Sequence, residues 1–206
     1  MLTEEALAQC ELPAGARVLD VGCGVGTTLN YLVSAHQFAA VGVDTSCKVL
    51  TGARQEHPDL AFAQAVAEYL PFASTSIAAI IAECVLSIVS ERKRVLREFS
   101  RVLAAGGTLI ASDVYARYAS PNAMSHHILT QAQIIEQLSA YGFAVESWQD
   151  HSPALREFVA QMIWGGGTFE DFCAQAQLFE TTAPPSEATR KALGYYALVA
   201  RKGGLR

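Results

Sequence analysis

Short apolar runs alternate with amphipathic stretches along the chain. The first run comprises Val18, Leu19 and Val21, the second spans Ala39–Val43, and the third, Ile77–Ala82, is apolar without alternation. An unbroken apolar run is typical of a parallel strand that is buried on both faces. Between the runs, apolar residues recur at helical spacing. Strands that alternate with helices predict a doubly wound α/β fold around a mostly parallel sheet.

The same patterns predict the remaining elements. Helices are expected at Leu2–Cys10, Thr28–Ala35, Ser46–Glu56, Glu91–Leu103, Thr130–Tyr141, Pro153–Trp164 and Thr168–Leu178. Further strands are expected at Leu60–Ala65, Thr108–Ser112, Phe143–Gln149 and Gly194–Ala200. Thr3 and Thr130 are suited to cap the helices in which they stand, because a threonine hydroxyl accepts a hydrogen bond from a free backbone N–H. Gly106 and Gly107 are expected to end the helix before them.

The composition bounds the kind of protein. A chain of 206 residues suffices for one α/β domain with a substantial core and is short for two. With 51% hydrophobic and 17% charged residues, a disordered chain is excluded. The net charge is −5 and no long basic run occurs, so we expect no nucleic-acid partner.

The cysteines and the N-terminal residues give evidence about the cellular compartment. Five cysteines are scattered along the chain without a Cys-x-x-Cys pair, which predicts neither a disulfide framework nor a metal site. No signal peptide is visible, and no apolar run is long enough to cross a membrane. We therefore expect a cytoplasmic protein with no membrane partner.

A glycine-rich turn follows the first strand. Gly22, Gly24 and Gly26 stand at every second position directly after it. Glycine permits unusual backbone angles and leaves no Cβ between the backbone and a ligand. Asp44 closes the second strand, where a carboxylate is placed to bind both hydroxyls of a ribose. The two features together predict a site for a nucleotide-like ligand.

These residues also carry a family resemblance. The stretch Val18–Gly26 followed by Asp44 resembles the class I S-adenosylmethionine (SAM)-dependent methyltransferases. Glu68–Phe72 is similar to the adenine-side loop of that family, and Leu96–Ile110 to its helix, tight turn and fifth strand. The resemblance covers most of the chain. It implies a seven-stranded, Rossmann-like, mostly parallel sheet with an antiparallel last strand, and SAM as the cofactor.

The resemblance also implies which residues contact the cofactor. Asp20 is expected to order the glycine loop and to reach the SAM ammonium group, directly or through water, and Asp44 to bind the ribose. The full set of expected cofactor contacts is Asp20, Gly22, Cys23, Gly24, Gly26, Thr27, Asp44, Thr45, Ala67, Glu68 and Glu83.

The adenine side departs from the family pattern. Val66 stands where the family usually has an acidic residue for the adenine amino group, and Ala78 where many relatives have another acidic residue. Backbone groups around Ala67 are left to contact the adenine edge, and Glu68 is either a substitute carboxylate or a solvated loop charge. We expect a retained SAM site with weaker or altered adenine recognition.

A methyl acceptor would lie beyond the carboxyl ends of the fourth and fifth strands. Glu83 and Cys84 end the fourth strand, and Asp113 and Tyr115 end the fifth. Candidate catalytic residues are Glu83, Asp113 and His127, the last of which lies beside His126 in an expected lid-like segment at about 114–129. Alternatively, Glu83 caps a helix or forms a salt bridge. The alternative for His126 and His127 is that both are surface residues without a catalytic role.

The function expected from these patterns is methyl transfer from SAM to a small-molecule acceptor. Residues 1–206 would form a single domain, monomeric or homodimeric, with a helical insertion at about 153–189. One alternative is a SAM-binding or partner protein without catalytic activity. The other is an NAD(P)-dependent oxidoreductase, which is disfavoured because Thr27 stands where its glycine pattern requires a glycine.

Overall fold

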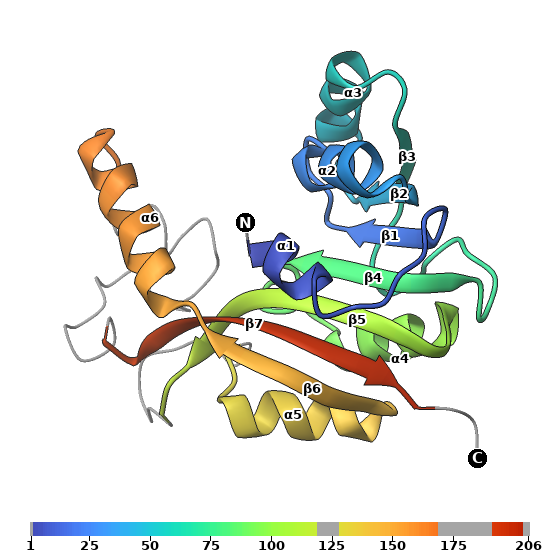
Figure 1. Ribbon diagram of the computed structural model, residues 1–206. Coiled ribbons are helices and arrows are strands. Elements are labelled where there is room, and N and C mark those ends of the chain that lie inside the picture. Colours follow the sequence, from blue (N-terminus) through green and yellow to red (C-terminus); the bar gives the residue numbers. More distant parts are fainter. Residues whose placement is uncertain (1, 119–127, 169–190, 204–206) are drawn as a thin grey trace.

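The computed structural model describes residues 2–118, 128–168 and 191–203. These residues build a seven-stranded sheet with the strand order β3-β2-β1-β4-β5-β7-β6 (Figure 1). The strands are β1 (Arg17–Val21), β2 (Ala39–Asp44), β3 (Ala61–Gln64), β4 (Ile77–Glu83), β5 (Leu103–Ala116), β6 (Phe143–Asp150) and β7 (Leu193–Lys202). β7 pairs antiparallel with β5 and β6, and the other neighbouring strands pair parallel. The expected doubly wound sheet with an antiparallel last strand is thereby confirmed.

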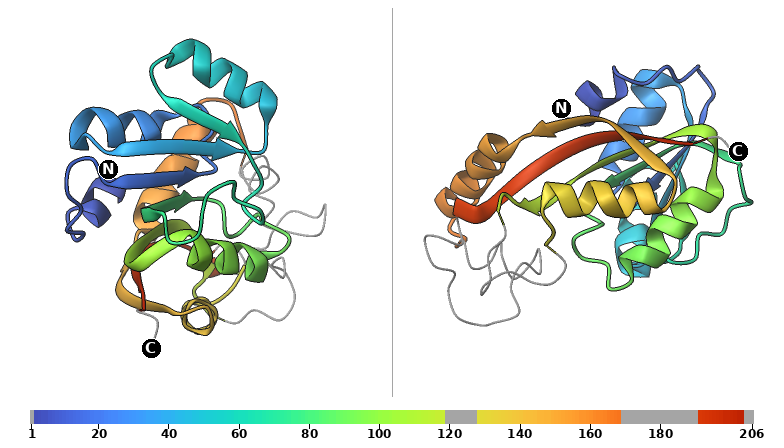
Figure 2. Two further views of the ribbon diagram at one scale, coloured as in Figure 1. Left: turned by 90° about the vertical axis from the view of Figure 1, so that its right-hand side faces the viewer. Right: turned by 90° about the horizontal axis from the view of Figure 1, so that it is seen from below.

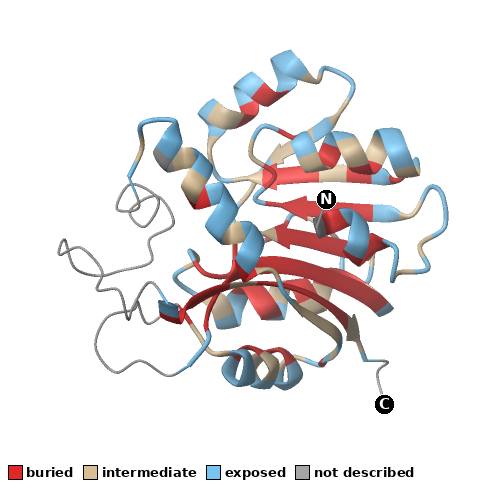
Figure 3. Cartoon of the chain, turned by 60° about the vertical axis from the view of Figure 1, so that its left-hand side comes forward, coloured by how far each residue is buried: buried red, intermediate tan, exposed pale blue. Residues whose placement is uncertain are grey.

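Helices cover both faces of the sheet. They are α1 (Leu2–Leu7), α2 (Thr27–His36), α3 (Cys47–Glu56), α4 (Arg92–Val102), α5 (Gln131–Ala140) and α6 (Ser152–Trp164). α1 and α2 bury Leu7 and Leu29 against one face, and α4 and α5 bury Phe99 and Leu138 against the other (Figure 2). The central strands are buried and the outer helix surfaces are exposed (Figure 3). No described helix has the length and apolar character needed to cross a membrane.

The first helix differs from its prediction. α1 ends at Leu7 rather than at Cys10, and Thr3 lies inside it rather than at its cap. The Thr3 hydroxyl donates a hydrogen bond to the carboxylate of Glu83, at the end of β4. The Thr3 hydroxyl therefore makes a tertiary hydrogen bond and does not provide the helix cap that the local sequence predicts.

The junction of α4 and β5 also differs. α4 ends at Val102, and Gly106 and Gly107 lie inside the segment that continues as β5. Gly106 has a φ of +72°, which suits glycine, and a Cβ on Gly107 would lie 2.9 Å from the Ala104 carbonyl oxygen. β5 extends as far as Ala116 because β7 pairs with it from Thr108 to Ala116. These glycines therefore shape the start of a strand and do not end the helix.

The predicted cap of the fifth helix is confirmed. Thr130 accepts a hydrogen bond from the Gln133 backbone N–H, and the Gln133 side chain bonds back to the Thr130 backbone. α6 begins the expected insertion and packs Val159 against Leu193 of β7. The further helix expected at Thr168–Leu178 lies, from residue 169 on, outside the described residues.

Candidate functional site

The site lies at the carboxyl edge of the parallel strands, where β1 stands between β2 and β4. Gly22, Gly24 and Gly26 of the loop after β1 all have positive φ angles, of 72°, 53° and 89°. A Cβ on Gly22 would lie 2.6 Å from Val85 Cγ2. The glycine loop therefore packs directly against the loop after β4, and only a residue without a side chain allows that approach.

Asp44 ties the glycine loop to the second strand. Its Oδ2 accepts a hydrogen bond from the Gly24 backbone N–H at 3.1 Å, and its Oδ1 accepts one from the Ser46 N–H at 2.8 Å. Each carboxylate oxygen has two lone pairs, so both oxygens keep accepting capacity for the hydroxyls of a ligand. Asp44 thus lies where the sequence predicts a ribose contact.

A cleft of about 390 Å³ opens beside Asp44. Five of the expected cofactor residues, Gly22, Asp44, Thr45, Ala67 and Glu68, line it together with Val21, Val43, Ala65, Val85, Ile88, Val89 and Ser90. Apolar walls with a few polar groups at one end suit a nucleoside, which has a flat apolar base and a hydroxylated sugar.

Asp20 provides the test of fit for a cationic cofactor. The side chain is 2% exposed, and its Oδ2 has no hydrogen-bond partner. Burial and, to a smaller extent, the charges of Glu83 and Asp44 together raise the pKa of Asp20 to about 7, against a hydrogen bond from the Leu29 backbone N–H that lowers it. An orphaned carboxylate oxygen beside two other acidic groups fits the ammonium group of SAM.

Glu83 is held by hydroxyls that sequence reasoning missed. Thr28 donates to its Oε2 at 2.6 Å, and Thr3 donates to its Oε1. These residues lie 55 and 80 positions away from Glu83 in the chain. Only the position of Thr28, just after the glycine loop, offered a signal in the sequence.

Three further expected cofactor residues, Cys23, Gly26 and Thr27, do not line the cleft. The Cys23 side chain is buried, and a Cβ on Gly42 would lie 2.7 Å from its Sγ. Gly26 precedes α2, and a Cβ there would lie 2.8 Å from the Phe62 ring. Thr27 is exposed at the start of α2. Any cofactor contact by Cys23 or Gly26 would be through the backbone.

A second polar chain begins at Cys84. Its Sγ lies 3.3 Å from the Tyr195 hydroxyl, which donates to Ser112 Oγ at 3.1 Å. Burial raises the pKa of the Cys84 thiol to about 11. Burial also raises the pKa of the Tyr195 hydroxyl well above its usual value. Cys84 also has a φ of +54°, an uncommon angle for a residue with a side chain. The three groups are neutral hydrogen-bonding groups at neutral pH, and no pattern in the sequence indicated Tyr195 or Ser112.

The comparisons with known proteins agree with this geometry. Residues 19–111 match the family model described as a methyltransferase domain. Residues 19–111 are thus identified as a class I methyltransferase domain. Methyltransferase GfsG of Streptomyces halstedii is 30% identical over 156 residues, which are 70% of this chain and 56% of that relative. The chain thus spans little more than half of that relative's length.

Two further likenesses cover nearly the whole chain. The O-methyltransferase resE of Aspergillus sclerotiorum is 27% identical over 217 aligned positions, which cover 98% of this chain and 81% of the relative. The crystal structure of the [4+2]-cyclase SpnF superposes with a TM-score of 0.80 at 25% identity, over 99% of this chain and 80% of that one. The methyltransferase fold is therefore shared beyond residues 19–111.

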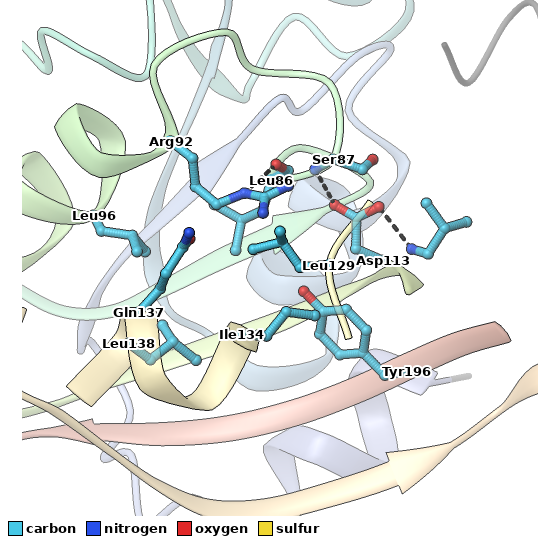
Figure 4. A pocket seen from close by; sticks show the side chains of 11 residues that line it. Leu86, Ser87, Arg92, Leu96, Asp113, Leu129, Ile134, Gln137, Leu138 and Tyr196 are labelled. Carbon is cyan, nitrogen blue, oxygen red and sulfur yellow. Dashed lines mark hydrogen bonds between the residues drawn. The ribbon is translucent and has the colours of Figure 1, made fainter. Parts of the chain in front are cut away.

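In this methyltransferase domain, Asp113 lies apart from Glu83. Glu83 pairs with Ser112 across β4 and β5, so the Asp113 side chain points to the opposite face of the sheet. There it accepts hydrogen bonds from the Ser87 N–H at 2.8 Å and the Val114 N–H at 2.7 Å (Figure 4). Burial raises the pKa of Asp113. The carboxylate thereby holds the loop after β4 that walls the cleft.

The remaining acceptor-side candidates have other surroundings. Tyr115 is buried, with its ring 5.4 Å from that of Trp148 and 6.1 Å from that of Tyr196. His126 and His127, together with most of the expected lid-like segment, lie outside the described residues. The described part therefore brings together the cofactor residues and Glu83, but not the three candidate catalytic residues.

Proposed function

We propose that this chain transfers a methyl group from SAM to a small-molecule acceptor. The observation that carries the proposal is the partnerless, buried Oδ2 of Asp20, which directly precedes Val21 and Gly22, two residues that line a nucleoside-sized cleft. A cofactor with both a nucleoside and a cationic amino acid satisfies the two features at once. NAD(P) offers no aminoacyl ammonium for that oxygen.

Different residues of the chain bind different parts of SAM. Asp44 holds the ribose hydroxyls, Ala67 and Glu68 face the base, and Asp20 with Glu83 faces the aminoacyl end. When bound, SAM supplies an activated methyl group for in-line displacement by the acceptor. The protein then contributes alignment and the exclusion of water, for which rigid strand ends and a glycine loop fixed by Asp44 are suited.

The acceptor side is proposed at the ends of β4, β5 and β7. Cys84, Tyr195 and Ser112 offer neutral hydrogen bonds there. We keep His127 as a candidate base, and assign Glu83 to the aminoacyl end of SAM and Asp113 to holding the loop after β4. A small acceptor is supported by the net charge of −5, which disfavours nucleic acid. The chain is proposed to act as one domain, as a monomer or homodimer.

A SAM-binding protein that transfers no methyl group is the second candidate. One observation favours it: burial raises the pKa of Cys84 to about 11 and that of Tyr195 further, so neither side chain is a base at neutral pH. The same fold also occurs in the [4+2]-cyclase SpnF, which is named for another reaction.

Methyl transfer itself separates the two candidates. The purified protein is incubated with SAM that carries an isotopic label in the methyl group and with a panel of small carboxylates, amines, phenols and enols. Mass spectrometry then follows labelled product and S-adenosylhomocysteine (SAH). Labelled product with any acceptor supports the transferase. Tight SAM binding without product across the panel favours the second candidate.

A further inference from the structure

The carboxylate of Glu83 is held by helices that are remote from it in the chain. Thr28 of α2 donates to Oε2 at 2.6 Å, and Thr3 of α1 donates to Oε1. Thr3 is 2% exposed, so its hydroxyl is withdrawn from water into this contact. Two hydroxyls that donate to different oxygens of one carboxylate fix the orientation of its plane.

α1 is held in place by tertiary contacts alone. A helix of six residues is too short to be stable by itself. Ala6 and Leu7 are buried in the core, and the Glu4 side chain forms a hydrogen bond with Tyr31 of α2. The docking of α1 is therefore what delivers the Thr3 hydroxyl to the end of β4.

The strand order indicates which part of a ligand meets Glu83. β1 lies between β2, which ends at Asp44, and β4, which ends at Glu83. The nucleoside-sized cleft is beside Asp44, whereas Glu83 is not among its lining residues. Asp20, with its orphaned oxygen, lies near enough to both carboxylates to be affected by their charges. A ligand laid along this edge has its sugar at Asp44 and its far end at Glu83.

We propose that Thr3 is a positioning residue of the cofactor site, which orients Glu83 toward the ammonium group at the aminoacyl end of SAM. The inference rests on the proposed function, because it assumes that SAM or SAH occupies the edge. It adds α1, which lies before the glycine loop in sequence, to the elements that determine cofactor affinity.

The test compares two ligands and three variants by calorimetric titration. SAH has the aminoacyl group, and methylthioadenosine keeps the nucleoside but lacks that group. Thr3→Val removes the hydroxyl at nearly constant volume, and Thr3→Ser retains it. Thr51→Val is the matched control, since Thr51 is exposed on α3 and donates only to the Cys47 carbonyl.

The expected result is selective. Thr3→Val should bind SAH about tenfold more weakly than the wild type, which is a typical loss for one hydrogen bond to a charged group. Its affinity for methylthioadenosine should be unchanged, and Thr3→Ser and Thr51→Val should behave like the wild type. Unchanged SAH binding by Thr3→Val would overturn the inference, as would equal losses for both ligands, which indicate a general structural defect. A wild-type protein that binds neither ligand would contradict the proposed function and the inference with it.

Discussion

At the scale of single residues, the site depends on one acidic group kept away from water. Asp20 is buried in β1, and its ionisation is opposed by burial and by the charges of Glu83 and Asp44. The sequence predicted Asp20 and Asp44 because they have fixed offsets from the glycine loop. It did not predict Thr3 or Tyr195, because the partner of each hydroxyl is decided by packing between segments 80 or more residues apart.

The first prediction concerns pH. The pKa of Asp20 is raised to about 7 in the folded protein, and a bound cation favours its charged form, so cofactor binding releases a proton below that pH. SAH affinity should therefore rise with pH from 5.5 to 7.5, by close to tenfold per unit at the acidic end. Calorimetry across this range tests it.

The matched variant is Asp20→Asn, which keeps the shape and removes the charge. It should bind SAH more weakly at pH 7.5, and its affinity should be nearly independent of pH. Without ligand, the wild type should lose stability relative to Asp20→Asn as pH rises from about 4 through 7, because the raised pKa of Asp20 favours the protonated carboxyl. A pH slope that survives the substitution would assign the titration to another group.

The second prediction separates two glycines of the loop. Gly22→Ala forces a Cβ to within 2.6 Å of Val85 Cγ2 at a φ of +72°, whereas Gly24→Ala meets nothing within 4 Å at a φ of +53°. Gly24→Ala should cost about 1 kcal/mol through backbone strain alone, and Gly22→Ala roughly 2–4 kcal/mol. Urea unfolding of both variants measures the difference. Equal costs would mean that the loop after β4 moves away easily.

At the scale of elements, the sequence predicted the type and order of every described helix and strand. The elements that it delimited well, such as α5 and β6, have local signals at their ends, namely a threonine cap and flanking glycine. The end of α4 was predicted to within one residue, but the start of β5 was expected at Thr108 instead of Leu103, because Leu103 pairs with Ile77 of β4. Local signals do not reveal pairing between strands that are far apart in the sequence.

The third prediction tests the capping of α5. Thr130→Ala removes the hydroxyl that accepts the Gln133 N–H and should destabilise the protein by about 1 kcal/mol. Thr51→Ala, which removes an exposed hydroxyl from the interior of α3, should change stability little. Urea denaturation followed by circular dichroism measures both. A loss for Thr130→Ala no larger than for Thr51→Ala would show that the cap contributes nothing.

At the scale of the whole molecule, the sheet order places the carboxyl ends of β1, β2 and β4 side by side. That order follows from the alternation of strands and helices, which is why the cofactor edge could be predicted. The face to which each side chain points could not, since a shift of one residue reverses it. Asp113 shows this, because it lies one position beyond Ser112 and therefore on the face opposite Glu83.

Binding of SAH to the wild type, Asp44→Ala and Asp59→Ala tests the proposed cofactor site. Asp59 is an exposed aspartate before β3, so its substitution removes the same charge away from the cleft. We expect binding by the wild type and Asp59→Ala, and a loss on the order of 100-fold for Asp44→Ala. Affinity in Asp44→Ala equal to the wild type, or no binding by the folded wild type, would contradict the proposed site.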